Sequence, residues 1–216
     1  MIFRLLFVSL MGWSAGVCWA SDADKPHPHQ GVLTPITRAP AAVQLTAEEV
    51  ATLQSGERVE HHSRGDDGGS GVAVQYISAS PQTIWGTILS YHRYKDWVNN
   101  VRECSIYKRD GNDLYVDMQI SVFGFRSGFY TKNTVRKDEG YMSWMLDYSR
   151  KSDVDDMVGY WRVEAITTDP PLTKLEYSTQ MKMKGVPGFV VDYLTRDALG
   201  EGTDWVKLRA EQAQAK

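Results

Sequence analysis

Apolar and polar residues alternate through much of the stretch from Val98 to Met183, which is the pattern of antiparallel strands with one buried face. Two more strands are predicted over 58–62 and 71–79, joined by a Gly- and Asp-rich hairpin turn. Other turn signals fall at 110–112, 138–140 and 168–171. The most regular strand ends at Met183, with Leu175, Tyr177, Thr179, Met181 and Met183 on one face.

Helical patterns flank the strands. Thr46 and Glu49 have the spacing of a capping box, which predicts a short helix after them. Ser80 stands at the N-cap of a second predicted helix, directly before a proline. Beyond residue 188 the period becomes helical and stays so to the end of the chain, interrupted by Gly200 and Gly202. Two glycines so close together predict a bend, or a close approach by another backbone or a ligand.

The order of these elements predicts one α+β domain over residues 43–212, without internal repeats or a linker. Residues 21–42 carry four prolines in polar sequence and show no apolar period, so they are predicted to form a flexible N-terminal segment. His27 and His29 lie in that segment. Two histidines in a loose tail are expected to be solvated rather than to hold a metal.

The first residues have the features of a cleavable signal peptide over 1–20. Arg4 supplies a positive charge, an apolar core follows, and small residues precede Ser21. The apolar core is short compared with the roughly 20 residues that cross a bilayer, which argues against the alternative of a retained anchor. A second alternative is lipid attachment at Cys18, and the Val17 before it argues against this. The protein is therefore expected to be secreted, with the periplasm as its location.

Charge and cysteine content narrow the partners. The chain has 24 basic and 27 acidic residues, and only Arg4 of these lies in the predicted signal. A mildly acidic chain lacks the basic footprint of a nucleic-acid-binding protein, so no nucleic-acid partner is expected. Cleavage would leave Cys104 as the single cysteine, so no intrachain disulfide can form. Cys104 is expected to act as a small buried apolar residue rather than as a nucleophile.

Four short motifs, in order, suggest a family. Residues 79–85 (Ala-Ser-Pro-Gln-Thr-Ile-Trp) and 94–98 (Tyr-Lys-Asp-Trp-Val) are followed by 159–163 (Gly-Tyr-Trp-Arg-Val) and 186–190 (Val-Pro-Gly-Phe-Val). Over residues 45–212 the chain resembles the START-like, or Bet v 1-like, helix-grip superfamily, which includes the polyketide cyclase/dehydrase and lipid transport group. The resemblance implies a curved antiparallel β-sheet wrapped around a long C-terminal helix, with an apolar cavity between them. It also implies binding of lipids, sterols or polyketides.

Residues that could support catalysis are sparse. His61 and His62 are adjacent on a strand and face opposite ways, and His92 follows a helix, so no metal-site spacing is present. Asp153, Asp155 and Asp156 are expected to form a solvated hairpin tip, because the other ligands of a calcium loop are absent. The sequence predicts no catalytic residue, no metal and no cofactor, and a non-enzymatic role is favoured over an enzymatic one.

Bulky apolar residues on inward-facing positions instead favour a ligand cavity. Methionine suits an irregular apolar ligand because its side chain is deformable. The alternative is that these residues only fill the core. The predicted ligand-binding residues are Trp85, Met118, Phe129, Trp144, Trp161, Tyr177, Met181, Met183, Val190 and Leu194.

Three functions remain open at this stage. The first is an exported carrier or sensor of a hydrophobic molecule such as a lipid, with Arg126, Lys132 or Arg162 near the cavity mouth. The second is a cyclase or hydrolase in which Tyr130, Tyr160 or Arg162 polarises a carbonyl, and the third is an interaction domain with a filled core. Export argues against polyketide cyclisation, since activated acyl-carrier substrates are cytoplasmic. The Phe123-Gly124-Phe125 connection could gate the cavity or make transient contact with a membrane. Cavity volume discriminates among these functions, because a ligand site typically encloses about 300–1,000 Å³.

Overall fold

A computed structural model describes residues 21–65, 67–184, 189, 192–193 and 198–216. The predicted signal peptide and the predicted ligand-binding residues Val190 and Leu194 lie outside the described residues. The fold is α+β, with an antiparallel sheet of eight strands in the order β1-β2-β8-β7-β6-β5-β4-β3. The strands are β1 (Val59–Gly65), β2 (Gly68–Ile77), β3 (Val101–Asp110), β4 (Asp113–Val122), β5 (Phe125–Arg136), β6 (Tyr141–Leu146), β7 (Asp156–Thr168) and β8 (Pro171–Lys182).

The predicted strands and turns are confirmed. In β8, Leu175 is fully buried in the core, and Tyr177 and Met181 pack against the same core. The β3–β4 turn contains Gly111, and a short 3-10 helix, η2 (Lys137–Glu139), joins β5 to β6 through Gly140. Both glycines have positive φ angles, +56° and +75°, which side chains rarely adopt. These turns set the register in which alternate residues reach the concave face.

The helices lie where their sequence signals indicate. In α1 (Ala47–Gln54), Thr46 Oγ1 accepts from the Glu49 N–H at 3.2 Å and Glu49 Oε2 accepts from the Thr46 N–H at 2.8 Å, so the capping box is present. In α2 (Pro81–Ile88), Ser80 Oγ accepts from the Thr83 N–H at 3.2 Å. Two short helices follow, η1 (Tyr91–Arg93) and α3 (Tyr94–Trp97).

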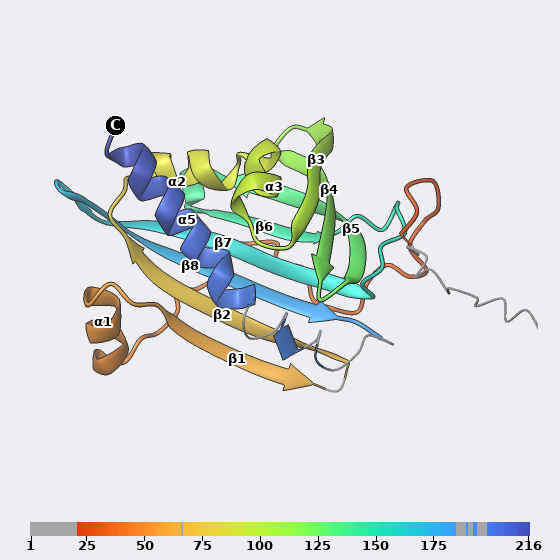
Figure 1. Ribbon diagram of the computed structural model, residues 1–216, viewed down its shortest axis with the longest axis horizontal. Coiled ribbons are helices and arrows are strands. Elements are labelled where there is room, and N and C mark those ends of the chain that lie inside the picture. Colours follow the sequence, from red (N-terminus) through yellow and green to blue (C-terminus); the bar gives the residue numbers. More distant parts are fainter. Residues whose placement is uncertain (1–20, 66, 185–188, 190–191, 194–197) are drawn as a thin grey trace, which may run out of the picture.

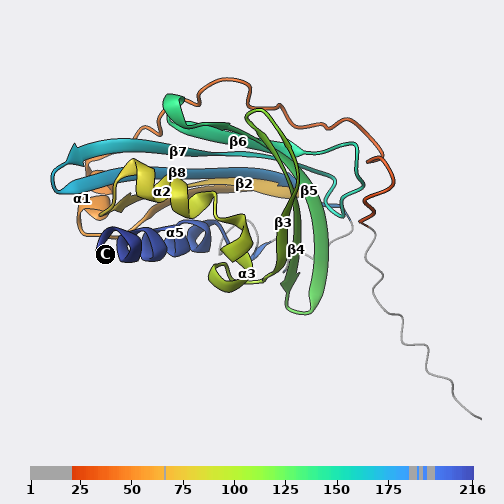
Figure 2. The same ribbon diagram turned by 90° about the horizontal axis from the view of Figure 1, so that it is seen from above.

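The C-terminal helix α5 (Ala198–Gln214) packs against α2, β2 and β8. Figures 1 and 2 show α2, α3 and α5 on one side of the curved sheet. The main core fills the space between them and contains Ile84, Trp85 and Ile88 of α2, with Trp205 and Val206 of α5. This arrangement is the predicted sheet wrapped around a long C-terminal helix.

Residues 21–45, here called the strap, differ from the flexible segment that the sequence predicts. Figure 2 shows the strap, in red to orange, crossing the face of the sheet opposite the helices. Asp22 pairs with Lys151 in a β-bridge. His27 is only 6% exposed, and its Nε2 lies 2.9 Å from the Asp155 carbonyl oxygen. The prolines remove donors and helical propensity, but an extended chain can still lie across a sheet.

Asp156 is one of the residues that hold the strap. Its carboxylate is fully buried rather than on a solvated hairpin tip, which corrects the prediction for this residue. It accepts hydrogen bonds from the N–H groups of Val32 (2.6 Å) and Leu33 (2.7 Å) and from the Tyr148 hydroxyl (2.7 Å). Burial raises the pKa of Asp156, but these bonds and one from the Met157 N–H outweigh it and lower the pKa below its ordinary value. A buried charge thus anchors the strap.

Candidate ligand-binding cavity

A cavity of about 200 Å³ lies inside the concave face of the sheet. Its walls come from β4, β5, β6, β7 and β8, from α3 and the segment after it, and from the first half of α5. Most of the lining is apolar. Three tryptophans, Trp144, Trp161 and Trp205, line it together with Tyr91, Tyr94 and Tyr177. We call this space the inner cavity.

Six of the ten predicted ligand-binding residues line the inner cavity: Met118, Phe129, Trp144, Trp161, Tyr177 and Met181. Trp85 and Met183 do not line it and are buried in the surrounding core instead. Trp85 lies on α2 and Met183 directly follows β8, and an inward-facing residue at either place can pack in the core without reaching the cavity. Whether the six residues contact a ligand remains a prediction.

Aromatic rings from three strands form one wall of the cavity. The Trp161 and Tyr177 ring centroids are 4.3 Å apart, and the Trp144 and Tyr177 rings stack at 5.7 Å. Trp161 and Tyr177 face each other across β7 and β8, while Trp144 on β6 lies opposite Gly159 of β7. A Cβ atom at Gly159 would overlap the Trp144 ring. The glycine in the Gly159-Tyr160-Trp161 motif therefore makes room for an indole.

The two glycines of α5 permit a close approach by side chains, rather than by the backbone or ligand that the sequence pattern suggested. A Cβ atom on Gly202 would lie 2.8 Å from Cε1 of Tyr177, and Gly202 itself lines the cavity. At Gly200 a Cβ would meet the side chains of Arg58 and Glu60. The helix can thus lie directly against the aromatic wall and the first strand.

The sequence reasoning missed a polar cluster at the cavity mouth. The Nδ2 amide of Asn100 donates to the Tyr193 hydroxyl at 2.6 Å, and that hydroxyl donates to Glu201 Oε2 at 2.9 Å. Asn99 Nδ2 donates to the same carboxylate oxygen at 3.3 Å. Asn100 has a φ of +63°, which asparagine tolerates better than most residues. The adjacent asparagines before a predicted strand were the available signal.

The interior of the cavity is electrically neutral. Burial raises the pKa of Tyr177 to about 12, with a smaller opposing effect from its hydrogen bond to Thr179, and burial also raises the pKa of Tyr91. Asn133 Nδ2 is held by Thr131 Oγ1 at 2.8 Å. Among the described lining residues, Glu201 at the mouth carries the one ionisable carboxylate, and no histidine is present. Such a lining can solvate an apolar molecule and offer neutral hydroxyl donors inside.

Cys104 packs against the core from β3 rather than facing a reactive partner. Burial, with a smaller contribution from the charge of Asp117, raises its thiol pKa to about 12. A thiol in this state is not a nucleophile near neutral pH. Partial burial in the core agrees with the small apolar role that the sequence predicted.

The polar residues predicted near the cavity lie on the opposite face of the sheet. Phe129, Thr131 and Asn133 of β5 line the cavity, so their neighbours Tyr130 and Lys132 face outward because strand residues alternate. The same alternation turns Arg126 away. The predictions that place these three residues at the mouth or in the site are therefore wrong.

Tyr160 and Arg162 are turned outward for the same reason, since Trp161 between them lines the cavity. Arg162 Nη1 lies 2.6 Å from Glu164 Oε2 and 3.3 Å from Glu176 Oε1. Glu176 is fully buried, and its Oε1 accepts from the Val43 N–H of the strap at 3.3 Å. Arg162 thus neutralises a buried carboxylate and is not available to polarise a ligand carbonyl in the inner cavity.

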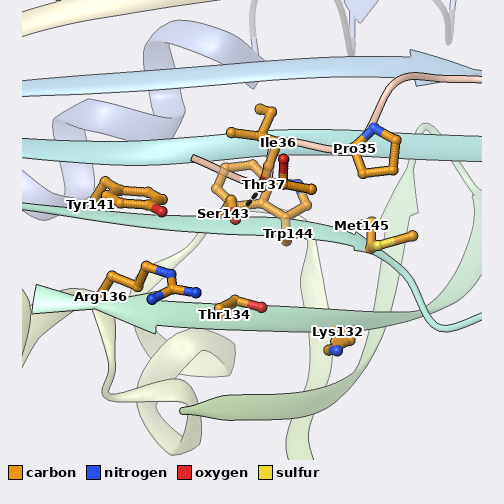
Figure 3. A pocket seen from close by; sticks show the side chains of 10 residues that line it. All are labelled: Pro35, Ile36, Thr37, Lys132, Thr134, Arg136, Tyr141, Ser143, Trp144 and Met145. Atoms are coloured by element: carbon orange, nitrogen blue, oxygen red, sulfur yellow. Dashed lines mark hydrogen bonds between the residues drawn. The ribbon is translucent and has the colours of Figure 1, made fainter. Parts of the chain in front are cut away.

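A second hollow, of about 210 Å³, lies between the strap and the outer face of β5 and β6. Figure 3 shows Pro35, Ile36 and Thr37 of the strap above Lys132, Thr134 and Arg136 of β5 and Tyr141, Ser143 and Met145 of β6. Several of its polar side chains already have partners. Lys132 pairs with Asp113 at 2.8 Å, Arg136 pairs with Glu139 at 3.2 Å, and Ser143 Oγ donates to the Ile36 carbonyl at 3.0 Å.

Two exposed aromatic side chains stand beside the mouth of the inner cavity. Phe123, at the β4–β5 tip, is 73% exposed, and Phe189 is 56% exposed. Their ring centroids lie 6.0 Å apart, and the Phe123 ring is 5.5 Å from that of Tyr193. Val122 and Tyr193 line the cavity. The aromatic tip is therefore continuous with the mouth.

The described residues hold no cluster of three or more His, Cys, Asp or Glu side chains able to bind a metal ion. In the same part of the chain, no helix has both the length and the apolar character needed to cross a bilayer.

Comparisons with known proteins give the family. The family model for polyketide cyclase / dehydrase and lipid transport matches residues 77–200. No curated protein matches the sequence significantly.

Three solved structures show the same fold at low identity. A START superfamily protein from Mycobacterium smegmatis is 19% identical, with 67% of this chain and 98% of that chain covered and a TM-score of 0.57. A protein from Thermus thermophilus is 13% identical over 67% of this chain and 95% of that chain, with a TM-score of 0.55. The di-domain ARO/CYC StfQ from the steffimycin biosynthetic pathway is 11% identical over 79% of this chain and 56% of that chain, with a TM-score of 0.51.

The matched segment runs from the end of β2 to the first turn of α5, so it contains α2, six strands and most of the cavity wall. It covers more than half of the 216 residues. The resemblance inferred from the four motifs is confirmed, and the chain belongs to the polyketide cyclase/dehydrase and lipid transport family, with its START-like helix-grip fold.

Proposed function

We propose that this protein is exported to the periplasm and holds a hydrophobic molecule, lipid or sterol-like, in the inner cavity, as a carrier or sensor. The observation that carries the proposal is the cavity itself, an apolar space with three tryptophans in its wall and one polar mouth. The family description, which includes lipid transport, supports the same class of ligand. A filled core, the alternative considered from the sequence, would leave no such space.

The size of the cavity limits how a ligand would fit. Its volume of about 200 Å³ is below the roughly 300–1,000 Å³ of sites for drug-sized molecules. Met118 and Met181 line it, and methionine side chains rearrange readily. We therefore expect a slender ligand such as a single acyl chain, or a larger one admitted by movement of these methionines.

Transient contact with a membrane is part of the proposal. Phe123 and Phe189 expose their rings next to the mouth, where a molecule would pass between a bilayer and the cavity. Aromatic side chains are favoured at the level of lipid headgroups. Replacing both phenylalanines by serine should reduce binding to phosphatidylglycerol–phosphatidylethanolamine vesicles in a sedimentation assay without lowering the affinity for a soluble ligand. Unchanged sedimentation would argue against this route.

Export is testable separately from binding. Expression of the full chain should yield a periplasmic product that begins at Ser21, identified by N-terminal sequencing of the fractionated protein. A product that instead begins at a lipid-modified Cys18, identified by mass spectrometry, would show lipid attachment. A product that keeps residues 1–20 in the membrane fraction would show a retained anchor instead.

The binding proposal is tested by native mass spectrometry of protein purified from the periplasm. We expect a co-purified hydrophobic molecule, or uptake of one on titration. In Met181→Trp the larger ring should fill the cavity and abolish binding. Gln180→Trp, on the exposed outer face of the same strand, is the matched control and should bind normally. Wild-type protein that carries no such molecule and takes none up would overturn the proposal.

An enzyme acting on a hydrophobic substrate in the same cavity is the second candidate. It is favoured by one observation, since Tyr91, Tyr177 and the carboxylate of Glu201 line the cavity. A neutral tyrosine can donate a hydrogen bond to a substrate carbonyl. The two candidates differ in the fate of the ligand: a carrier releases it with unchanged mass, whereas an enzyme converts it on prolonged incubation.

A further inference from the structure

The polar cluster at the mouth is assembled from segments far apart in the sequence. Asn99 and Asn100 precede β3, Tyr193 lies before α5, and Glu201 is in the first turn of α5. The main chain of Asn100 is fixed, because its carbonyl accepts from the Ser121 N–H of β4 at 2.8 Å. The Asn100–Tyr193–Glu201 chain of hydrogen bonds therefore holds the carboxylate at a defined place beside the apolar cavity.

One oxygen of that carboxylate is left for a ligand. Tyr193 and Asn99 both donate to Oε2 of Glu201. Within the described residues, Oε1 has no hydrogen-bond partner and no basic side chain lies within ion-pair distance of the carboxylate. The mouth thus presents a hydrogen-bond acceptor that carries negative charge.

We propose that Glu201 sets the ligand class by its charge: the inner cavity accepts apolar molecules with a hydrogen-bond donor as head group, a hydroxyl or an ammonium, and rejects carboxylates and phosphates. This inference rests on the proposed function. A hydroxyl or ammonium head donates to Oε1 while its chain occupies the cavity beside Trp161 and Tyr177. An anionic head at the same place meets the like charge of Glu201, and no basic side chain of the described residues lies within ion-pair distance to offset it. Asn99, Asn100 and Tyr193 act as positioning residues.

The test compares three probes that differ only in head group: octanol, octylamine and octanoate at pH 7. The fluorescence of Trp144, Trp161 and Trp205, which line the cavity, reports binding. A hydrogen bond to a charged acceptor changes affinity by about tenfold or more. Wild-type protein should therefore bind octanol and octylamine at least about tenfold more tightly than octanoate.

Three variants isolate the effect of the Glu201 charge on the choice of head group. Glu201→Gln keeps the size and a carbonyl oxygen, and should lose most of the discrimination against octanoate. Glu201→Lys should reverse it, which gives a positive result that simple damage to the cavity would not produce. Glu57→Gln removes an exposed carboxylate outside the cavity lining and should behave as wild type. Circular dichroism verifies that each variant is folded.

The outcomes separate the two proposals. Binding of all three probes with equal affinity, or a preference that survives in Glu201→Gln and Glu201→Lys, would overturn the role of Glu201 and leave the cavity as a ligand site. Binding of none of the probes, combined with an empty protein in native mass spectrometry, would overturn the proposed function and this inference with it.

Discussion

Removing the Asp156 carboxylate should detach the strap from the sheet. In Asp156→Ala the N–H groups of Val32, Leu33 and Met157 and the Tyr148 hydroxyl lose their acceptor. A buried donor left without a partner costs about 1–3 kcal/mol. Detachment of the strap lets water solvate the Val32 and Leu33 amides, which leaves the Met157 N–H and the Tyr148 hydroxyl as the buried donors without this partner. About 3 kcal/mol, within the range for two such donors, is the expected loss in the free energy of unfolding.

The assay has a global and a local readout. Urea denaturation gives the free energy of unfolding, and hydrogen exchange gives the protection of the Val32 and Leu33 amides, which should fall in Asp156→Ala. Asp156→Asn keeps one acceptor oxygen, so its free energy of unfolding should lie between those of Asp156→Ala and wild type. Asp138→Ala, which removes an exposed aspartate from η2, is the matched control. A loss below about 0.5 kcal/mol with unchanged amide protection would refute the anchoring role.

The remaining predictions concern pH, packing and reactivity. The pKa of Asp156 is lowered in the folded protein, so its contribution to stability is present above the unfolded pKa of about 3.9 and disappears as pH falls through the folded value. The strap amides should lose protection from hydrogen exchange in that pH range. Protection that does not change with pH would contradict this. Gly159→Ala should destabilise the protein by about 1–3 kcal/mol, because the new methyl group overlaps the Trp144 ring. Gly86→Ala, whose methyl group meets open space on α2, should stabilise the protein by about 0.5–1 kcal/mol. Thermal denaturation measures both effects. Cys104, with a thiol pKa of about 12, should resist iodoacetamide at pH 8 until the chain is unfolded, and rapid labelling of the native protein would show that the thiol is accessible and ionised.

The sheet and its inner face were predictable from period-two alternation alone. The cavity is lined by Tyr177 and Met181 of β8 and by Met118 of β4. The alternation of apolar and polar residues predicts all three on the inner face. The same rule could have excluded Arg162 and Tyr160, because both are neighbours of the inward Trp161. The chemical ability to polarise a carbonyl does not fix the face on which a strand residue lies. Parity is therefore the stronger guide for a strand residue.

The strap and the mouth could not be derived in this way. The strap is held by bonds from Val32 and Leu33 to Asp156, more than a hundred residues away, and its proline-rich composition resembles that of a loose tail. The mouth joins Asn100 to Tyr193, from segments that meet only after the sheet has curved. Contacts of this kind depend on tertiary structure and leave no local pattern of hydrophobic positions.

The strap and the cavity are linked through the two faces of one sheet. Charged residues such as Arg162 and Glu176 alternate with cavity residues such as Trp161 and Tyr177, so a register shift of one residue would carry charges into the cavity. The outer face must therefore accommodate these charges, and Glu176 is fully buried there, with Arg162, Lys174 and the Val43 N–H as its partners. Because the Val43 N–H belongs to the strap, the strap helps to stabilise the Glu176 carboxylate on the outer face of the sheet, away from the neutral cavity.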